Sequence, residues 1–180
     1  MSNPYAVVID SNVLAKGLHR NVLLNLAAAE CFRPIWSDTI LVETEVSITK
    51  MGGDGPKRRR QLEAAFPGAL ADPSYIHLVR LVHLEDEDDR HVVAVALQEN
   101  ADAICTENLR DFGLSTVDVL TPDEFITDTI DLSPVRAISA LAQMRARMTS
   151  IQDGQSYVDL LADRGLVEAA QYLRPYAERL

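Results

Sequence analysis

The sequence lacks a long hydrophobic run, an excess of basic residues and a cysteine framework. Its longest apolar stretches, such as residues 92–97, fall far short of the roughly 18 to 20 residues that a membrane-spanning helix needs. With 27 acidic against 17 basic side chains, the net charge is −10, which argues against a surface that is basic throughout. Cys31 and Cys105 show no Cys-x-x-Cys spacing, so reduced, buried thiols are expected rather than disulfides or a zinc site.

The first residues also lack the features of an export signal. Residues 1–5 carry no basic flank, and polar residues 10–12 arrive before an apolar region of signal length. We therefore expect a cytoplasmic location and no membrane partner. What the sequence does contain is 47% hydrophobic and 24% charged residues over 180 positions, which predicts one globular domain with at most a short appendage.

Short apolar runs alternate with helical patterns over the first two-thirds of the chain. Strands are expected at residues 5–9, 34–36, 103–105 and 117–120, and a further strand could lie within 76–84. Helices are expected at residues 22–31, 40–50, 57–66 and 92–100. This alternation predicts a three-layer α/β domain with a central parallel sheet flanked by helices.

Beyond about residue 128 no strand pattern remains. Ser133-Pro134 is typical of a helix start, residues 156–159 resemble a capping box, and a last helix is expected from Leu166 to the end. We therefore predict an α/β domain at residues 1–127 and a small all-helical extension at residues 128–180.

Three carboxylates stand near the expected ends of strands or the start of a helix. Asp10 follows the first strand directly, Asp111 lies shortly after the strand at 103–105, and Asp89 opens the helix after an acidic run. Because open parallel sheets bind ligands at their carboxyl edge, these side chains could form one site. Grouped carboxylates favour Mg²⁺ or Mn²⁺ over zinc. Each acid alone also fits a cap or a turn, and residues 86–88 fit a solvated loop.

Four segments together resemble a known family. They are Asp10-Ser11-Asn12 after an apolar strand, residues 37–43, residues 86–97 and residues 106–112. Their order and spacing are similar to those of the PIN-domain family, metal-dependent ribonucleases that include the VapC toxins of bacterial type II toxin–antitoxin pairs. The resemblance covers about residues 5–125. The helical tail looks like an extension found on a subgroup of bacterial PIN proteins.

The resemblance implies a PIN-like fold and a set of site residues. The four acids that would be catalytic and would hold one or two Mg²⁺ or Mn²⁺ ions are Asp10, Glu43, Asp89 and Asp111. Supporting polar positions are Asn12, Thr106 and Asn108. Helical periodicity does not choose between Glu43 and Glu45, and the resemblance favours Glu43.

Basic side chains at two kinds of position are candidate RNA contacts. They are the run Lys57, Arg58, Arg59 and Arg60, and the two arginines beside proposed ligands, Arg90 and Arg110. For the basic run, a solvated helix face is the alternative interpretation.

The implied activity is endoribonuclease cleavage, in which metal-activated water hydrolyses an RNA phosphodiester bond and leaves 5′-phosphate and 3′-hydroxyl ends. A small cognate antitoxin protein and a homodimer are further implications of the resemblance. The alternatives are a catalytically inactive PIN-fold RNA-binding or protein-interaction module, and a structure-specific DNA nuclease. An aspartyl-phosphate phosphatase is disfavoured because Asn12 stands where that chemistry needs a second aspartate.

Overall fold

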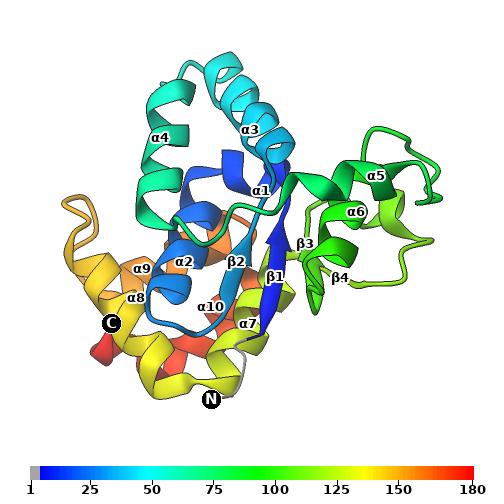
Figure 1. The fold of residues 1–180 in the computed structure, drawn as a ribbon. Helices are drawn as coiled ribbons and strands as arrows, with labels where there is room; N and C mark the ends of the chain where they lie inside the picture. The colour runs from blue at the N-terminus through cyan, green and yellow to red at the C-terminus, as the bar shows by residue number, and fades with distance from the viewer. Residues whose placement is uncertain (1–4) are drawn as a thin grey trace. The chain divides into compact units, whose positions relative to one another are not determined.

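The computed structural model describes residues 5–180, which group into two compact units (Figure 1). The first unit contains the residues up to Lys16 together with Arg33–Thr121. The second unit contains Gly17–Phe32 together with Pro122–Leu180. Each unit is thus assembled from two separate stretches of chain. The predicted division of the sequence between residues 127 and 128 stays a prediction.

The first unit is built on a four-stranded sheet in which every strand pair is parallel, as the sequence predicts. The strand order is β2-β1-β3-β4, so β1 lies between β2 and β3 (Figure 1). The strands are β1 (Ala6–Ile9), β2 (Arg33–Ile35), β3 (Ala103–Cys105) and β4 (Asp118–Leu120). Val8 pairs with Ile35 on one side and Ile104 on the other, and all of β1 and β3 is buried. Continuous apolar runs of this kind are typical of strands covered on both faces.

Helices flank this sheet. They are α1 (Ser11–Ala15), α3 (Asp38–Lys50), α4 (Gly55–Ala65), α5 (Ile76–Val79) and α6 (Arg90–Gln98), with 3₁₀ turns η1 (Pro73–Tyr75) and η2 (Leu109–Phe112). Ser37 caps α3, because its hydroxyl accepts a hydrogen bond from the Ile40 amide at 3.2 Å. Helix α6 packs on β1 and β3 and brings its first turn to the carboxyl edge of the sheet.

The possible strand within residues 76–84 is wrong. The Asp72 carboxylate accepts a hydrogen bond from the Ser74 amide at 2.8 Å, and this capped turn leads through η1 directly into α5. The apolar side chains of this segment do not alternate strictly, since Ile76 and Leu81 are exposed while Val82 and Leu84 are buried. A loose alternation of apolar and polar residues is weak evidence for a strand, and here the capped turn at Asp72 favours the helical conformation.

The second unit is entirely helical among the residues described. It consists of α2 (Gly17–Ala28), α7 (Pro122–Leu132), α8 (Pro134–Ala146), α9 (Gly154–Asp163), α10 (Val167–Leu173) and the 3₁₀ turn η3 (Arg174–Arg179). Helix α2 packs against α7 and α8, and α9 packs against α10. Phe32 and Phe125 meet edge to face, with ring centroids 4.8 Å apart. The C-terminal residues are thus helical, as predicted.

Two details of the predicted helices are corrected. Helix α9 begins at Gly154, and its cap is Asp153, whose carboxylate accepts from the Ser156 amide at 2.8 Å; the proposed capping box at 156–159 is wrong. The last helix does not run unbroken to the end, because α10 gives way to η3 near Pro175. Proline has no backbone donor for a regular α-helical bond, which accounts for the change.

Close packing fixes one glycine in the second unit. A Cβ atom at Gly154 would lie 1.9 Å from the carbonyl oxygen of Ala177, so only glycine fits there. Another tie joins α7 to α10, since the Asp123 carboxylate accepts from the amides of Glu168 and Ala169, both at 2.9 Å.

No helix among residues 5–180 is both long and apolar enough to cross a membrane. Both cysteines are free thiols. Cys105 is buried, as expected, whereas Cys31 is only half-buried.

Candidate metal centre at the carboxyl edge of the sheet

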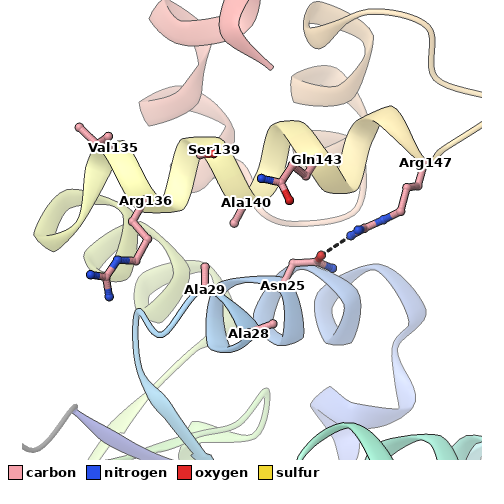
Figure 2. A pocket seen from close by; sticks show the side chains of 9 residues that line it. All are labelled: Asn25, Ala28, Ala29, Val135, Arg136, Ser139, Ala140, Gln143 and Arg147. Carbon is pink, nitrogen blue, oxygen red and sulfur yellow. Dashed lines mark hydrogen bonds between the residues drawn. The ribbon is translucent and has the colours of Figure 1, made fainter.

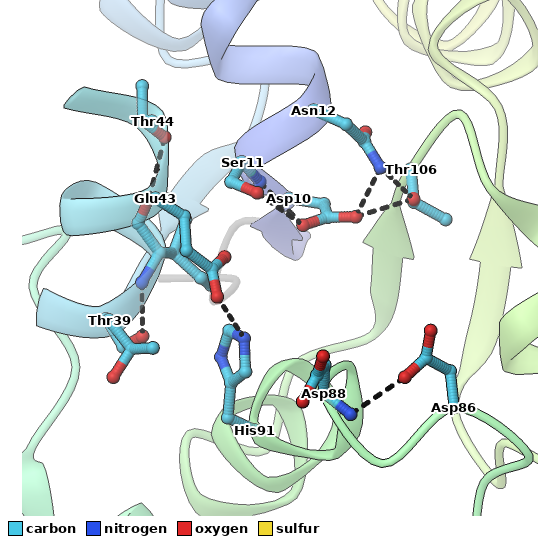
Figure 3. A network of polar contacts seen from close by, with 12 residues as sticks. Asp10, Ser11, Asn12, Thr39, Glu43, Thr44, Asp86, Asp88, His91 and Thr106 are labelled. Carbon is cyan, nitrogen blue, oxygen red and sulfur yellow. Dashed lines mark hydrogen bonds and ion pairs between the residues drawn. The ribbon is translucent and has the colours of Figure 1, made fainter. Parts of the chain in front are cut away.

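Asp10 occupies the first turn after β1 and is almost completely buried. Its amide donates to the carbonyl of Cys105 in the neighbouring strand, which fixes the backbone, and its side chain caps α1. Oδ1 accepts from the Ser11 amide at 2.6 Å, and Oδ2 accepts from Asn12 Nδ2 and from the Thr106 hydroxyl, both at 2.7 Å (Figure 3). Burial nevertheless raises the pKa of Asp10, because its effect outweighs these hydrogen bonds.

The supporting polar residues join the ends of β1 and β3. Asn12 Nδ2 also donates to Thr106 Oγ1 at 3.0 Å, and Asn12 Oδ1 accepts from the Glu107 amide at 3.2 Å. The Thr106 hydroxyl in turn accepts from the Asn108 amide at 3.1 Å. This network holds the Asp10 carboxylate in one orientation.

Three further carboxylates converge at the start of α6 and in η2. One oxygen from each of Asp86, Asp89 and Asp111 lies within 4.8 Å of the others. Asp89 stands at the N-terminal end of α6 without a capping hydrogen bond, and Asp111 accepts a hydrogen bond from the Asn108 amide side chain. Loop residue Asp86 accepts from the Asp88 amide at 2.9 Å. The sequence predicted Asp89 and Asp111 here and missed Asp86.

The charge of this cluster is costly for the folded chain. Burial, followed by the negative charges of Asp10, Asp86 and Asp111, raises the pKa of Asp89 to about 6, although His91 lowers it. A carboxylate with so high a pKa, surrounded by others, gains stability from a cation. Oxygen-only donors at this spacing suit Mg²⁺ or Mn²⁺, and the residues therefore fit the ion that the resemblance implies.

Glu43 lies in α3 and faces His91 rather than the Asp86, Asp89 and Asp111 group. Its Oε1 atom lies 3.0 Å from His91 Nε2 (Figure 3). Its negative charge helps to raise the pKa of Asp10, so the two carboxylates interact electrostatically. Of the four predicted acids, Asp89 and Asp111 share the group with Asp86. Asp10 is coupled to that group by its charge on Asp89, and Glu43 is coupled by charge to Asp10.

His91 is a second residue that the sequence interpretation missed. It lies in the first turn of α6, where its imidazole is the contact partner of Glu43. The other ring nitrogen, Nδ1, is buried without a hydrogen-bond partner among the residues described. Only the position of His91 two residues after Asp89 could have drawn attention to it.

The predicted RNA-contact arginines and lysine differ in how far their charges are matched. Arg59 bonds to Asp38 and Glu63, and Arg90 bonds to Glu87 at 3.0 Å. The four without a carboxylate partner among residues 5–180 are Lys57, Arg58, Arg60 and Arg110. Arg110 is exposed and adjoins Asp111 in η2. These four are the better candidates for contacts with an RNA phosphate backbone.

Comparison with protein families places two stretches of the chain. Residues 6–110 match the PIN domain, and residues 122–175 match the VapC50 C-terminal domain. Comparison with curated proteins gave no significant match, and neither did comparison with solved structures. The PIN-domain match spans more than half of the chain and includes β1, β3 and the acidic residues up to Asp89. The chain therefore belongs to the PIN-domain family, as a VapC-like member with a C-terminal extension.

Proposed function

We propose that this protein is a Mg²⁺- or Mn²⁺-dependent endoribonuclease that hydrolyses RNA phosphodiester bonds. The observation that carries the proposal is the group of Asp86, Asp89 and Asp111 beside buried Asp10, with the pKa of Asp89 raised to about 6. Members of the PIN and VapC families are typically metal-dependent nucleases, and the acidic group fits that chemistry. The proposed metal ligands are Asp10, Glu43, Asp89 and Asp111, to which we add Asp86.

Each residue of the site has a distinct part in the proposed reaction. Asp89 and Asp111 supply carboxylate oxygens, and Asn108 orients Asp111. Asn12 and Thr106 hold Asp10 in place, while His91 holds Glu43. A bound divalent ion lowers the pKa of its water and offsets charge on the phosphoryl group. Arg110, exposed beside Asp111, can contact a phosphate of the substrate.

The grouped carboxylates make the approach of an RNA backbone depend on a bound cation. Without a cation, the grouped carboxylates repel RNA phosphates, because both groups are negatively charged and a partly buried site weakens that repulsion less than bulk water does. With the carboxylates neutralised, the same edge of the sheet accepts an anionic backbone. Substrate binding at this edge and cleavage are therefore both expected to need the metal.

The direct test is cleavage of total RNA by the purified full chain in EDTA, Mg²⁺ or Mn²⁺. Asp89→Asn and Asp111→Asn are expected to lower the rate by at least roughly 100-fold, as loss of several kcal/mol of metal-mediated stabilisation predicts. Asp88→Asn is the matched control, because Asp88 is exposed in the same acidic run and lies outside the group.

The outcomes separate the alternatives. Discrete metal-dependent fragments with wild type and Asp88→Asn, lost in the other two variants, support the proposal. A folded wild-type chain that binds RNA and cleaves neither RNA nor structured DNA under any metal would favour an inactive binding module instead. Cleavage of structured DNA alone would favour the DNA nuclease.

As a VapC-like protein, the chain is proposed to act in the cytoplasm as a toxin that a small antitoxin restrains, and to form a homodimer. Family membership supports the antitoxin partner. Co-expression with the protein encoded next to it tests this: we expect a stable complex in which RNA cleavage is suppressed.

A further inference from the structure

A groove in the second unit lies between α2 and α8, and none of the acidic-centre residues or candidate RNA-contact residues lines it. It has a volume of about 490 Å³. Small side chains such as Ala28, Ala29 and Ala140 form its floor, while Ser139 and Gln143 add polar groups from α8. Figure 2 shows Arg136 near one end of α8 and Arg147 just past the other, with the groove between them.

The charge of the groove is opposite to that of the chain. Neither α2 nor α8 contains an aspartate or a glutamate, although the sequence has 27 acidic residues. Arg136 donates to the backbone carbonyl of Glu30 at 2.9 Å, and Arg147 donates to the amide oxygen of Asn25 at 2.5 Å. Neither guanidinium forms an ion pair with a carboxylate among residues 5–180. Both positive charges are exposed and uncompensated.

Neutral hydrogen-bond partners leave most of each guanidinium available. A guanidinium has five N–H donors in a planar fork that matches the oxygens of a phosphate, and each of these arginines uses one nitrogen within the unit. At 1.5 Å per residue, the interval from 136 to 147 spans about 16 Å along the helix. An occupant that engages both guanidinium groups therefore carries negative charges at two separated points.

We propose that this groove is a second RNA-binding site, which holds the phosphate backbone of single-stranded RNA between Arg136 and Arg147. The inference rests on the proposed function, in which RNA is the substrate. RNA carries a charge at every nucleotide, so it meets both arginines in any register, whereas an acidic peptide needs carboxylates at matching positions. No aromatic side chain lines the groove, so bases have no stacking platform there and binding is independent of sequence.

Binding of a labelled 20-nucleotide oligouridine to the full chain tests the proposal, measured by fluorescence anisotropy in EDTA. EDTA prevents cleavage and leaves the acidic centre repulsive, so metal-dependent binding at that centre does not contribute, and the groove variants isolate the part of the affinity that Arg136 and Arg147 supply. The double variant Arg136→Gln/Arg147→Gln is expected to bind about tenfold more weakly and to reduce the slope of log K against log salt by about 1.4, or 0.7 for each lost phosphate contact. Arg174→Gln is the matched control, because Arg174 is in the same unit and its charge is already paired with Asp159.

A second variant keeps the test decisive if the double variant does not fold. Gln143→Glu places a negative charge on an exposed position inside the groove and removes neither arginine. It is expected to weaken RNA binding by about fivefold, whereas Gln155→Glu, on the surface of α9, leaves binding unchanged.

Three results would overturn the inference. They are an unchanged salt slope in the double variant, unchanged binding in Gln143→Glu, and an oligoglutamate peptide that binds more tightly than the RNA and depends on the same arginines. This assay is independent of cleavage. If the chain cleaves RNA and the groove variants bind normally, the inference fails alone; if the groove binds RNA and no metal supports cleavage, the proposed nuclease fails alone.

Discussion

His91 Nε2 and Glu43 Oε1 lie 3.0 Å apart, and this contact joins the first turn of α6 to the middle of α3. His91 is mostly buried, whereas the Glu43 side chain is 40% exposed. The imidazole therefore fixes a carboxylate that would otherwise move freely. A metal ligand held by a second residue is better organised for its ion, because less side-chain entropy is lost on binding.

Replacing His91 by phenylalanine should weaken the site without removing a carboxylate. We expect a loss of about 10- to 100-fold in Mn²⁺ affinity, the range typical of residues that orient a ligand. His91→Gln, which retains a donor, should lose less. Titration calorimetry with Mn²⁺ measures the affinity, and equal affinity in both variants and wild type would show that the contact does not support a ligand.

Thr106→Val should disturb Asp10. The variant loses the 2.7 Å hydrogen bond from the Thr106 hydroxyl to a buried carboxylate, so the pKa of Asp10 should rise further and metal binding should weaken. A hydrogen bond to a charged group contributes about 1.5 to 3 kcal/mol to stability. Denaturant unfolding in EDTA measures this loss. Thr129→Val is the control, since that buried hydroxyl donates only to the Phe125 carbonyl of its own helix.

Removal of metal should make stability depend on pH through Asp89. Its pKa is about 6 in the folded chain against 3.8 ordinarily, so the folded state holds this proton more tightly. The resulting contribution to stability is fully present below about pH 4, declines as the pH rises and is lost above about pH 6. In EDTA, the Tm of wild type should therefore fall relative to that of Asp89→Asn over this interval.

Addition of Mn²⁺ should reverse the difference above pH 6, because a cation favours the ionised carboxylates and binds the folded chain. Thermal unfolding of both proteins from pH 4 to pH 7.5 gives the comparison. A Tm difference that does not change with pH in EDTA would contradict the raised pKa.

Gly154→Ala should destabilise the helical unit. The added Cβ would lie 1.9 Å from the Ala177 carbonyl oxygen, so the backbone of α9 or η3 must shift, at a cost of about 1 to 3 kcal/mol or more. Gly68→Ala is the control, because its Cβ would meet nothing within 4 Å. Thermal unfolding distinguishes the two, and equal Tm values would show that the packing there is looser than described.

Sequence patterns predicted most of the framework around the acidic centre. The apolar run before Asp10 identified β1. Because the sheet is parallel, a residue directly after β1 lies at its carboxyl edge, where Asp10 was expected. Asp86 escaped notice because every residue in its acidic run resembles solvated loop, and only the folded turn shows which one approaches Asp89. His91 was missed for a similar reason, since its partner Glu43 is far away in the sequence.

The groove could not be predicted at all. Its two walls, α2 and α8, come from opposite ends of the chain, and nothing in either helix indicates that the other will lie beside it. The absence of acidic residues from both is visible in the sequence, and it gains meaning only once the two helices are known to be neighbours. Hydrophobic periodicity predicts individual helices and strands, whereas the packing of elements that are distant in the sequence determines which residues form a site.

The assembly of the helical unit from Gly17–Phe32 and Pro122–Leu180 has a consequence for synthesis of the protein. Helix α2 leaves the ribosome early, but the helices α7 and α8 that cover one of its sides are made much later. At about 5 to 20 residues per second, α2 waits on the order of 5 to 20 s for these partners. During that time its uncovered apolar side chains are open to chaperones, and the unit closes only after α7 and α8 have been made.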